Sequence, residues 1–173
     1  MSRPAGTASL TLHLLRHAKS SWDDPALADA DRPLTARGER AAAKLVRRLA
    51  RERVAPGLVL CSSARRARQT LELILPALGD PAVLVEEGLY AAGAPALLAR
   101  LRQLPAGVRE AMLIGHNPGI HELAVLLAGG GAPASLHEGF PTGAMVSISL
   151  RGATWGDVRR GGVVTRLLLP REL

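Results

Sequence analysis

Short apolar runs alternate with longer amphipathic segments along most of this chain. Six apolar runs are predicted as strands, at residues 10–15, 58–61, 83–85, 111–115, 145–150 and 163–169. Between them, apolar residues recur at intervals of three and four, which is the spacing of one helix face. Helices are predicted from Thr35 to about Glu52, after Ser62 or Ser63, from Pro95 and from Pro118. This alternation predicts an α/β fold of three layers, with a mainly parallel central sheet and helices on both faces.

Two polar stretches interrupt this pattern and are predicted as loops. Residues 18–34 are rich in Ser, Asp and Pro, and residues 129–142 are rich in Gly and Pro. Loops this long inside a compact domain are usually functional. The sequence does not decide whether loop 129–142 closes over a substrate. Because no repeat or linker is evident, we expect a single domain over residues 9–173 and a flexible N-terminus at residues 1–8.

Composition and charge narrow the class of partner. Apolar residues make up 47% of the chain but aromatic residues only 2%, so the core must consist of Leu, Val and Ala. The net charge of +7 suits an anionic substrate or nucleic acid. Four aromatic residues offer little material for stacking bases: Trp22, Tyr90, Phe140 and Trp155. A nucleic-acid-binding module is therefore the weaker alternative, and we expect no nucleic-acid partner.

The sequence also indicates the cellular compartment and the oligomeric state that we expect for the protein. Cys61 is the only cysteine, so an intrachain disulfide is excluded, which fits the cytoplasm. No secretory signal pattern is found near Met1. The longest uncharged stretch, residues 123–136, is shorter than a membrane-spanning helix requires. We expect a cytoplasmic protein without a membrane partner, and a monomer because no helix carries a second apolar face.

Polar residues of matching chemistry follow three of the predicted strands. Arg16 and His17 follow the first strand, an arginine-rich segment at 62–70 follows the second, and His116 with Asn117 follows the fourth. The carboxyl ends of parallel strands meet at one edge of a sheet, where α/β proteins bind ligands. We therefore expect these residues to lie together although 50 to 100 positions separate them.

The residue types point to chemistry on a phosphoryl group. Arginine binds phosphate oxygens with a planar fork of donors, and histidine can attack phosphorus and carry the group covalently. Three cations open the second helix, Arg65, Arg66 and Arg68, although cations oppose the helix dipole there. A bound anion would reverse that penalty for one of them. We expect the other two to be solvated, and His116 to donate hydrogen bonds to phosphoryl oxygens.

The remaining histidines receive a structural interpretation. His13 lies within a strand, His121 on a helix and His137 in the Gly/Pro-rich loop, where it could at most touch substrate. The sequence has no His-Glu-x-x-His motif and no cysteine pair. No metal and no other cofactor is therefore expected.

These motifs resemble those of the histidine phosphatase superfamily, which has the phosphoglycerate-mutase-like fold. Leu-Arg-His-Ala at 15–18 resembles the Arg-His-Gly signature, and residues 62–70 resemble its Ser-Pro-x-x-Arg-Ala-x-Gln-Thr segment. Gly-His-Asn at 115–117 resembles the second histidine motif. The resemblance implies that His17 is the nucleophile, that Arg16, Arg66 and His116 form the phosphate pocket, and that no metal is needed. Ala18 and Ser63 depart from the family's glycine and proline.

Two further segments are similar to the short phosphohistidine phosphatase branch of this superfamily. They are Arg-His-Ala-Lys-Ser-Ser-Trp at 16–22 and Asp-Arg-Pro-Leu-Thr-x-Arg-Gly at 31–38. The expected substrate is a protein that carries phosphohistidine. The alternatives are a phosphatase or mutase for small phosphorylated molecules, and an inactive member that only binds.

Many members of the superfamily use a carboxylic acid to protonate the leaving group. Glu86 and Glu87, after the third strand, are the candidates here. Because histidine is a good leaving group, a phosphoramidate can be cleaved with little or no general acid. Further substrate contacts are expected from residues beside the strand ends, namely Ser20, Ser21, Trp22, Asn117 and Glu87.

Overall fold

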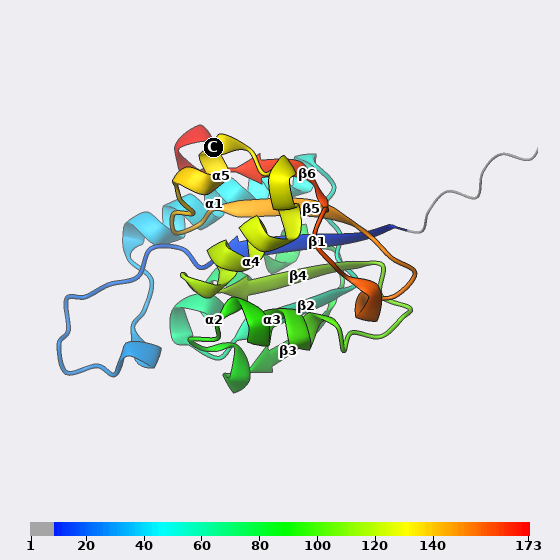
Figure 1. Ribbon diagram of the computed structural model, residues 1–173. Helices are drawn as coiled ribbons and strands as arrows, with labels where there is room; N and C mark the ends of the chain where they lie inside the picture. Colours follow the sequence, from blue (N-terminus) through cyan, green and yellow to red (C-terminus); the bar gives the residue numbers. More distant parts are fainter. Residues whose placement is uncertain (1–8) are drawn as a thin grey trace, which may run out of the picture.

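The computed structural model describes residues 9–173, which build one six-stranded sheet flanked by helices (Figure 1). The strand order is β3-β2-β4-β1-β5-β6. The strands span β1 (Ser9–Arg16), β2 (Leu58–Ser62), β3 (Ala82–Glu86), β4 (Glu110–Gly115), β5 (Met145–Arg151) and β6 (Val163–Leu168). The first four strands pair in parallel, while β5 pairs antiparallel with β1 and with β6. The mainly parallel sheet is thus confirmed, and the predicted flexible segment 1–8 lies outside the described residues.

Helices cover both faces of the sheet, as expected for three layers (Figure 1). On one face, α1 (Ala36–Arg51) and α2 (Arg65–Ile74) pack against side chains such as Leu15. On the other face lie α3 (Ala94–Leu101), α4 (Gly119–Ala128) and the short α5 (Ala134–Glu138). The Thr35 hydroxyl caps α1 by accepting a hydrogen bond from the Gly38 amide at 3.0 Å, as predicted.

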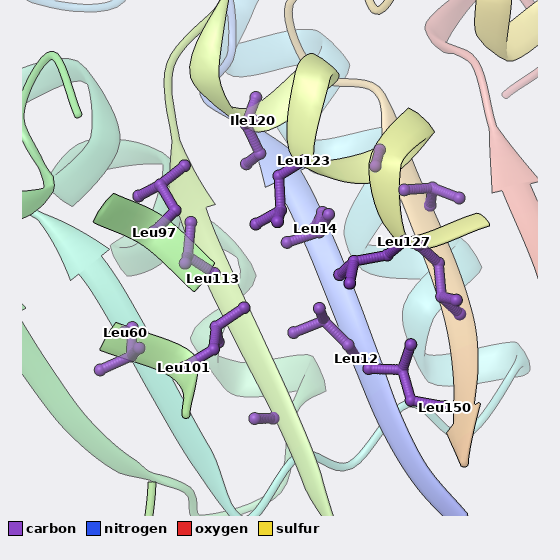
Figure 2. Close-up of a cluster of buried hydrophobic side chains, with 14 of the residues drawn as sticks. Leu12, Leu14, Leu60, Leu97, Leu101, Leu113, Ile120, Leu123, Leu127 and Leu150 are labelled. Atoms are coloured by element: carbon purple, nitrogen blue, oxygen red, sulfur yellow. The ribbon is translucent and has the colours of Figure 1, made fainter. Parts of the chain in front are cut away.

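Leucine side chains dominate the larger of the two cores. Figure 2 shows Leu12 and Leu14 of β1 on the same face as Leu97 of α3 and Leu123 of α4, all fully or almost fully buried. Leu15, the next residue of β1, is buried on the opposite face. Burial on both faces explains why the apolar run in β1 is nearly continuous rather than alternating. Each buried leucine contributes roughly 1.5–3 kcal/mol to folding.

Two predicted elements are wrong in detail. Neither Ser62 nor Ser63 caps α2, because β2 extends through Ser62 and the N-cap residue is Ala64, which has no capping side chain. The segment 129–142 is not a continuous loop. It contains a 3₁₀ turn at Gly129–Gly131 and the helix α5. A helix of five residues is too short for an apolar periodicity to show in the sequence.

Two further findings on the described residues concern the helices and an edge strand of the sheet. None of the helices within residues 9–173 combines the length and apolar character that crossing a membrane requires. The edge strand β3 has partly exposed apolar side chains, including Leu84 and Val85.

Gly38 provides a test of the packing that holds α1 beside loop 18–34. A Cβ atom at Gly38 would lie 2.2 Å from the backbone oxygen of Lys19. Gly38→Ala is therefore expected to destabilise the protein by about 1–3 kcal/mol, although alanine is the better helix former. Urea unfolding measures this change. Gly88→Ala is the control, because a Cβ there meets nothing within 4 Å, and it should stay within about 0.5 kcal/mol of wild type. An equally stable Gly38→Ala protein would contradict the close approach.

Candidate active site

The strand order brings the three polar segments together as expected. β4 lies between β1 and β2, so the carboxyl ends of these strands are adjacent. A pocket of about 350 Å³ opens there. It is lined by Arg16, His17, Lys19, Ser20, Trp22, Arg32, Arg66, His116, Asn117 and Thr142. The four residues predicted to handle phosphate are all among them.

His17 is buried, with only 6% of its surface exposed, and its ring is held at both nitrogens. Nδ1 lies 2.7 Å from the backbone oxygen of Ala18, and Arg66 Nε donates to Nε2 at 3.3 Å. A carbonyl oxygen only accepts hydrogen bonds, so the proton of the neutral ring is on Nδ1. Nε2 therefore carries the lone pair that an attack on phosphorus requires, and it accepts the Arg66 hydrogen bond with that pair until it attacks.

The surroundings keep both pocket histidines neutral. Burial lowers the pKa of His17 to about 3, and the charges of His116, Arg66 and Arg16 act in the same direction against the Ala18 hydrogen bond. Burial, followed by the charge of Arg66, lowers the pKa of His116 to about 4. The two ring centroids are 5.0 Å apart, so protonation of either ring disfavours protonation of the other.

These shifts predict a distinct titration that NMR of ¹⁵N-labelled histidine can follow. We expect His17 and His116 to remain neutral from pH 8 to below pH 5 and to protonate only near pH 3 to 4. In 8 M urea the same signals should titrate near 6.5, the value of an unfolded histidine. Because only the unfolded chain takes up these protons between pH 6.5 and 4, the free energy of unfolding should fall as the pH falls through this range. A His17 midpoint above pH 6 in the folded protein would contradict the burial argument.

His116 follows β4 and is oriented by Ser62 of β2. Its Nε2 lies 2.7 Å from the Ser62 hydroxyl oxygen, which also accepts a hydrogen bond from the Ala64 amide at 3.3 Å. When the Ser62 hydroxyl donates its proton to Nε2, the ring proton of His116 lies on Nδ1. That buried Nδ1 has no hydrogen-bond partner among the described residues. His116 can thus donate a hydrogen bond to a group in the pocket, the role predicted for it.

Arg16 and Asn117 are positioned by the segment that follows α5. Arg16 Nη1 and Asn117 Nδ2 both donate to the backbone oxygen of the buried Phe140, at 3.0 and 2.8 Å. The buried Nε of Arg16 and Oδ1 of Asn117 have no partner within residues 9–173. Burial, followed by the charge of Arg66, lowers the pKa of Arg16. An anion in the pocket would satisfy the Arg16 donor and neutralise this repulsion.

Arg66 is the one arginine of the α2 segment that enters the pocket, while Arg65 and Arg68 are exposed as expected. Its Nη1 donates to the backbone oxygen of Asp29 at 2.6 Å, and its Nη2 to the Asp29 carboxylate at 3.0 Å. Asp29 belongs to the 3₁₀ turn Asp29–Asp31 of the predicted loop 18–34. This loop therefore orients the guanidinium that α2 supplies.

The Asp29 carboxylate joins three neighbours. Besides Arg66, it accepts hydrogen bonds from Arg32 Nη1 at 2.7 Å and from the Tyr90 hydroxyl. These bonds, with that from Tyr90 the strongest, hold the pKa of Asp29 well below its usual value. Asp29 is thus ionised at neutral pH and has no proton to give to a leaving group.

The expected additional contacts divide into two groups. Ser20 and Trp22 line the pocket, where Ser20 accepts a hydrogen bond from Arg32 and the Trp22 ring lies 3.2 Å from the Arg32 guanidinium carbon. Ser21 does not line the pocket, because its hydroxyl accepts from the Asp23 amide in a local turn.

The two glutamates proposed as acids also lie outside the pocket lining. Glu86 is paired with Arg100, with the shortest contact at 2.6 Å. Glu87 is exposed in the 3₁₀ turn Glu87–Leu89. The structure therefore does not bring Ser21, Glu86 or Glu87 to the phosphate-handling residues.

The other histidines take part in structural contacts. His13 bridges Ser147 and Glu110 at 2.8 and 2.9 Å, and His121 contacts the backbone oxygen of Leu136 at 2.6 Å. His137 is exposed on α5 and does not line the pocket. Within residues 9–173, no group of three or more His, Cys, Asp or Glu side chains is arranged to hold a metal ion.

Comparisons with known proteins bear on the family of this chain. Residues 12–90 match the family model of the histidine phosphatase superfamily (branch 1). A structure described as the "putative phosphohistidine phosphatase SixA" from Nakamurella multipartitia is 31% identical, with a TM-score of 0.82, over 97% of this chain and 99% of that one. This chain belongs to the histidine phosphatase superfamily.

Two further relatives extend the comparison of this superfamily member. The structure of the protein histidine phosphatase SixA complexed with tungstate is 26% identical, with a TM-score of 0.78, over 94% of this chain and 99% of that one. An uncharacterized protein of Mycobacterium tuberculosis, Rv1276c, is 36% identical over 152 residues, which cover 85% of this chain and 93% of the relative.

The sequence reasoning missed several residues of this histidine phosphatase site. Asp29, Arg32 and Tyr90 form one hydrogen-bonded group that supports Arg66, and Ser62 orients His116. Arg32 was detectable, because it stands in the Asp-Arg-Pro-Leu segment shared with the phosphohistidine phosphatase branch. Asp29 and Tyr90 carried no comparable signal, since each is an isolated residue of a common type.

Proposed function

We propose that this protein is a phosphohistidine phosphatase, which hydrolyses the phosphoramidate bond of a phosphohistidine protein through a covalent phosphohistidine on His17. The observation that carries this proposal is a pocket with a neutral histidine nucleophile and phosphate-binding donors but no available acid. None of the ten residues that line it is a carboxylate. Asp29, which touches Arg66 from outside this lining, is held ionised by its neighbours.

The missing acid bears on the choice of substrate. An alcohol leaving group resembles water, whose pKa is about 15.7, so expulsion of an alkoxide without a proton is slow. A histidine side chain has a pKa of about 6.5 and is a far better leaving group. A site without an acid therefore suits a phosphoramidate better than an alkyl phosphate ester.

The proposed reaction has two steps. His17 Nε2 attacks phosphorus in line on a substrate ring that is protonated at its other nitrogen. The P–N bond of the substrate breaks, its electron pair returns to the ring nitrogen, and the substrate leaves as a neutral imidazole. Water then attacks phosphorus, the bond to Nε2 breaks, and inorganic phosphate leaves neutral His17. In both steps Arg16, Arg66 and His116 stabilise the charge on the equatorial oxygens.

A direct comparison of substrates tests the proposal. The purified protein, without added metal, is given a histidine-phosphorylated protein and an alkyl phosphate, and phosphate release is measured as kcat/KM for each. We expect a clear preference for the phosphohistidine. Equal or faster turnover of the ester, or of a sugar phosphate, would instead assign the site to a small-molecule phosphatase or mutase of the same superfamily.

A further inference from the structure

A second cavity continues from the catalytic pocket along the surface. It has a volume of about 460 Å³ and shares two lining residues, Lys19 and Thr142, with that pocket. Its walls come from the start of α1, from α5 and the residues after it, and from the 3₁₀ turn Pro170–Glu172, which lie side by side in Figure 1. We call this cavity the side groove. A substrate that places its phosphoryl group beside His17 reaches the side groove where Lys19 and Thr142 line both cavities.

The charges along the side groove are mainly positive. Lys19, Arg37 and Arg171 line it, against a single carboxylate, Glu138. Lys19 and Arg37 take part in no ion pair within residues 9–173, and Arg171 has only a long contact of 3.9 Å with its exposed neighbour Glu172. Three cations without close carboxylate partners form a surface that attracts acidic groups.

The position of Arg37 adds to this argument. It lies in the first turn of α1, where a cation opposes the helix dipole. Four residues later, Ala41 lines the same groove, and Lys44 one turn further donates to the backbone oxygen of Leu173 at 3.3 Å. The face of α1 toward the groove is therefore small and cationic. An acidic ligand there would offset the penalty at Arg37.

We propose that the side groove binds an acidic segment next to the phosphohistidine of the protein substrate. The occupant is an extended stretch of chain with Asp or Glu side chains, because the groove adjoins the catalytic pocket at Lys19 and Thr142 and combines apolar residues such as Leu169 and Pro170 with the three cations. The inference rests on the proposed function for its substrate. It names the class of phosphoprotein that this site selects.

Three peptides that differ only beside one phosphohistidine test the proposal, with flanking residues that are all Glu, all Gln or all Lys. For the wild type, kcat/KM should decrease in the order Glu, Gln, Lys. In the double variant Arg37→Glu/Arg171→Glu, the Glu peptide should lose about tenfold and the Lys peptide should gain. Hydrolysis of an aryl phosphate should not change, because neither residue lines the catalytic pocket. These differences should shrink in high salt.

Arg47→Glu is the matched control, since Arg47 is an exposed cation of the same helix that does not line the groove. It should leave all three peptides unaffected. The proposal is overturned if the wild type hydrolyses the Glu and Gln peptides equally, or if the double variant loses the same factor on every substrate. It is also wrong if a small bisphosphate depends on Arg37 and Arg171 while the Glu peptide does not.

A binding measurement separates failure of this proposal from failure of the proposed function. Fluorescence anisotropy at low salt follows unphosphorylated, labelled Glu and Gln peptides. If no phosphohistidine peptide is hydrolysed, tighter binding of the Glu peptide that is lost in the double variant still supports the side groove. Equal binding of the two peptides refutes it whatever the enzyme hydrolyses.

Discussion

His17→Ala should reduce phosphate release by at least about 10⁴-fold from every substrate that the wild type hydrolyses. The physical reason is that the covalent route ends with the loss of Nε2, the His17 nitrogen that carries the ring's lone pair beside Arg66 in the pocket. The wild type quenched during turnover should carry an acid-labile phosphoryl label, and His17→Ala should not. A coupled assay measures phosphate release, and a gel detects the phosphoryl label on the protein.

The matched control for this variant is His137→Ala. His137 is an exposed histidine outside the pocket, so its loss should leave turnover at the wild-type rate. Removal of a buried ring also leaves a cavity, and urea unfolding establishes that His17→Ala is folded at the assay temperature. A folded His17→Ala protein with more than a few per cent of wild-type activity would refute covalent catalysis by this residue.

The second large effect is expected at Arg66. Its guanidinium is buried at the pocket and aligned by Asp29, so it can stabilise charge that develops on the phosphoryl oxygens. Loss of one such preorganised donor costs about 2.7–4 kcal/mol, which is roughly 10² to 10³ in kcat. Arg66→Ala should show this decrease in kcat for phosphohistidine and for aryl phosphate alike, because both transfer the same group.

Two further variants separate charge from geometry at this position. Arg66→Lys keeps the charge but lacks the planar fork, so it should recover only part of the loss. Arg65→Ala, the exposed neighbour in the same helix turn, should behave as wild type. An increase in KM with an unchanged kcat would mean that Arg66 binds the substrate and the transition state equally, which would contradict its proposed role.

The sheet and its flanking helices were predictable because their signals are local. β1, β2 and β4 are apolar runs of strand length, and the amphipathic spacing of α1 and α2 matches a helix buried on one face. The meeting of Arg16, His17, Arg66 and His116 followed from one topological rule, that parallel strands end at a common edge. No comparable rule predicted which residues would contact these four side chains.

Side-chain partners across the fold explain the errors. Serine is a common helix-capping residue, but Ser62 is the last residue of β2 and lies beside His116. The buried ring of His116 needs a hydrogen-bond partner there. Phe140 stands in a segment rich in Gly and Pro, yet its side chain is buried and its backbone oxygen holds Arg16 and Asn117. In both cases a contact with a residue distant in the chain outweighed the local preference.

The sequence by itself determined the architecture of this protein, the edge of the sheet that carries its chemistry and the four residues that meet there. Periodicity and strand ends are properties of neighbouring residues, so they can be identified without coordinates. Only the tertiary structure decided the protonation and environment of the site. The pairing of Asp29 with Arg66, the engagement of Glu86 by Arg100 and the joining of the side groove to the catalytic pocket depend on distances between segments that pack together only in the folded chain.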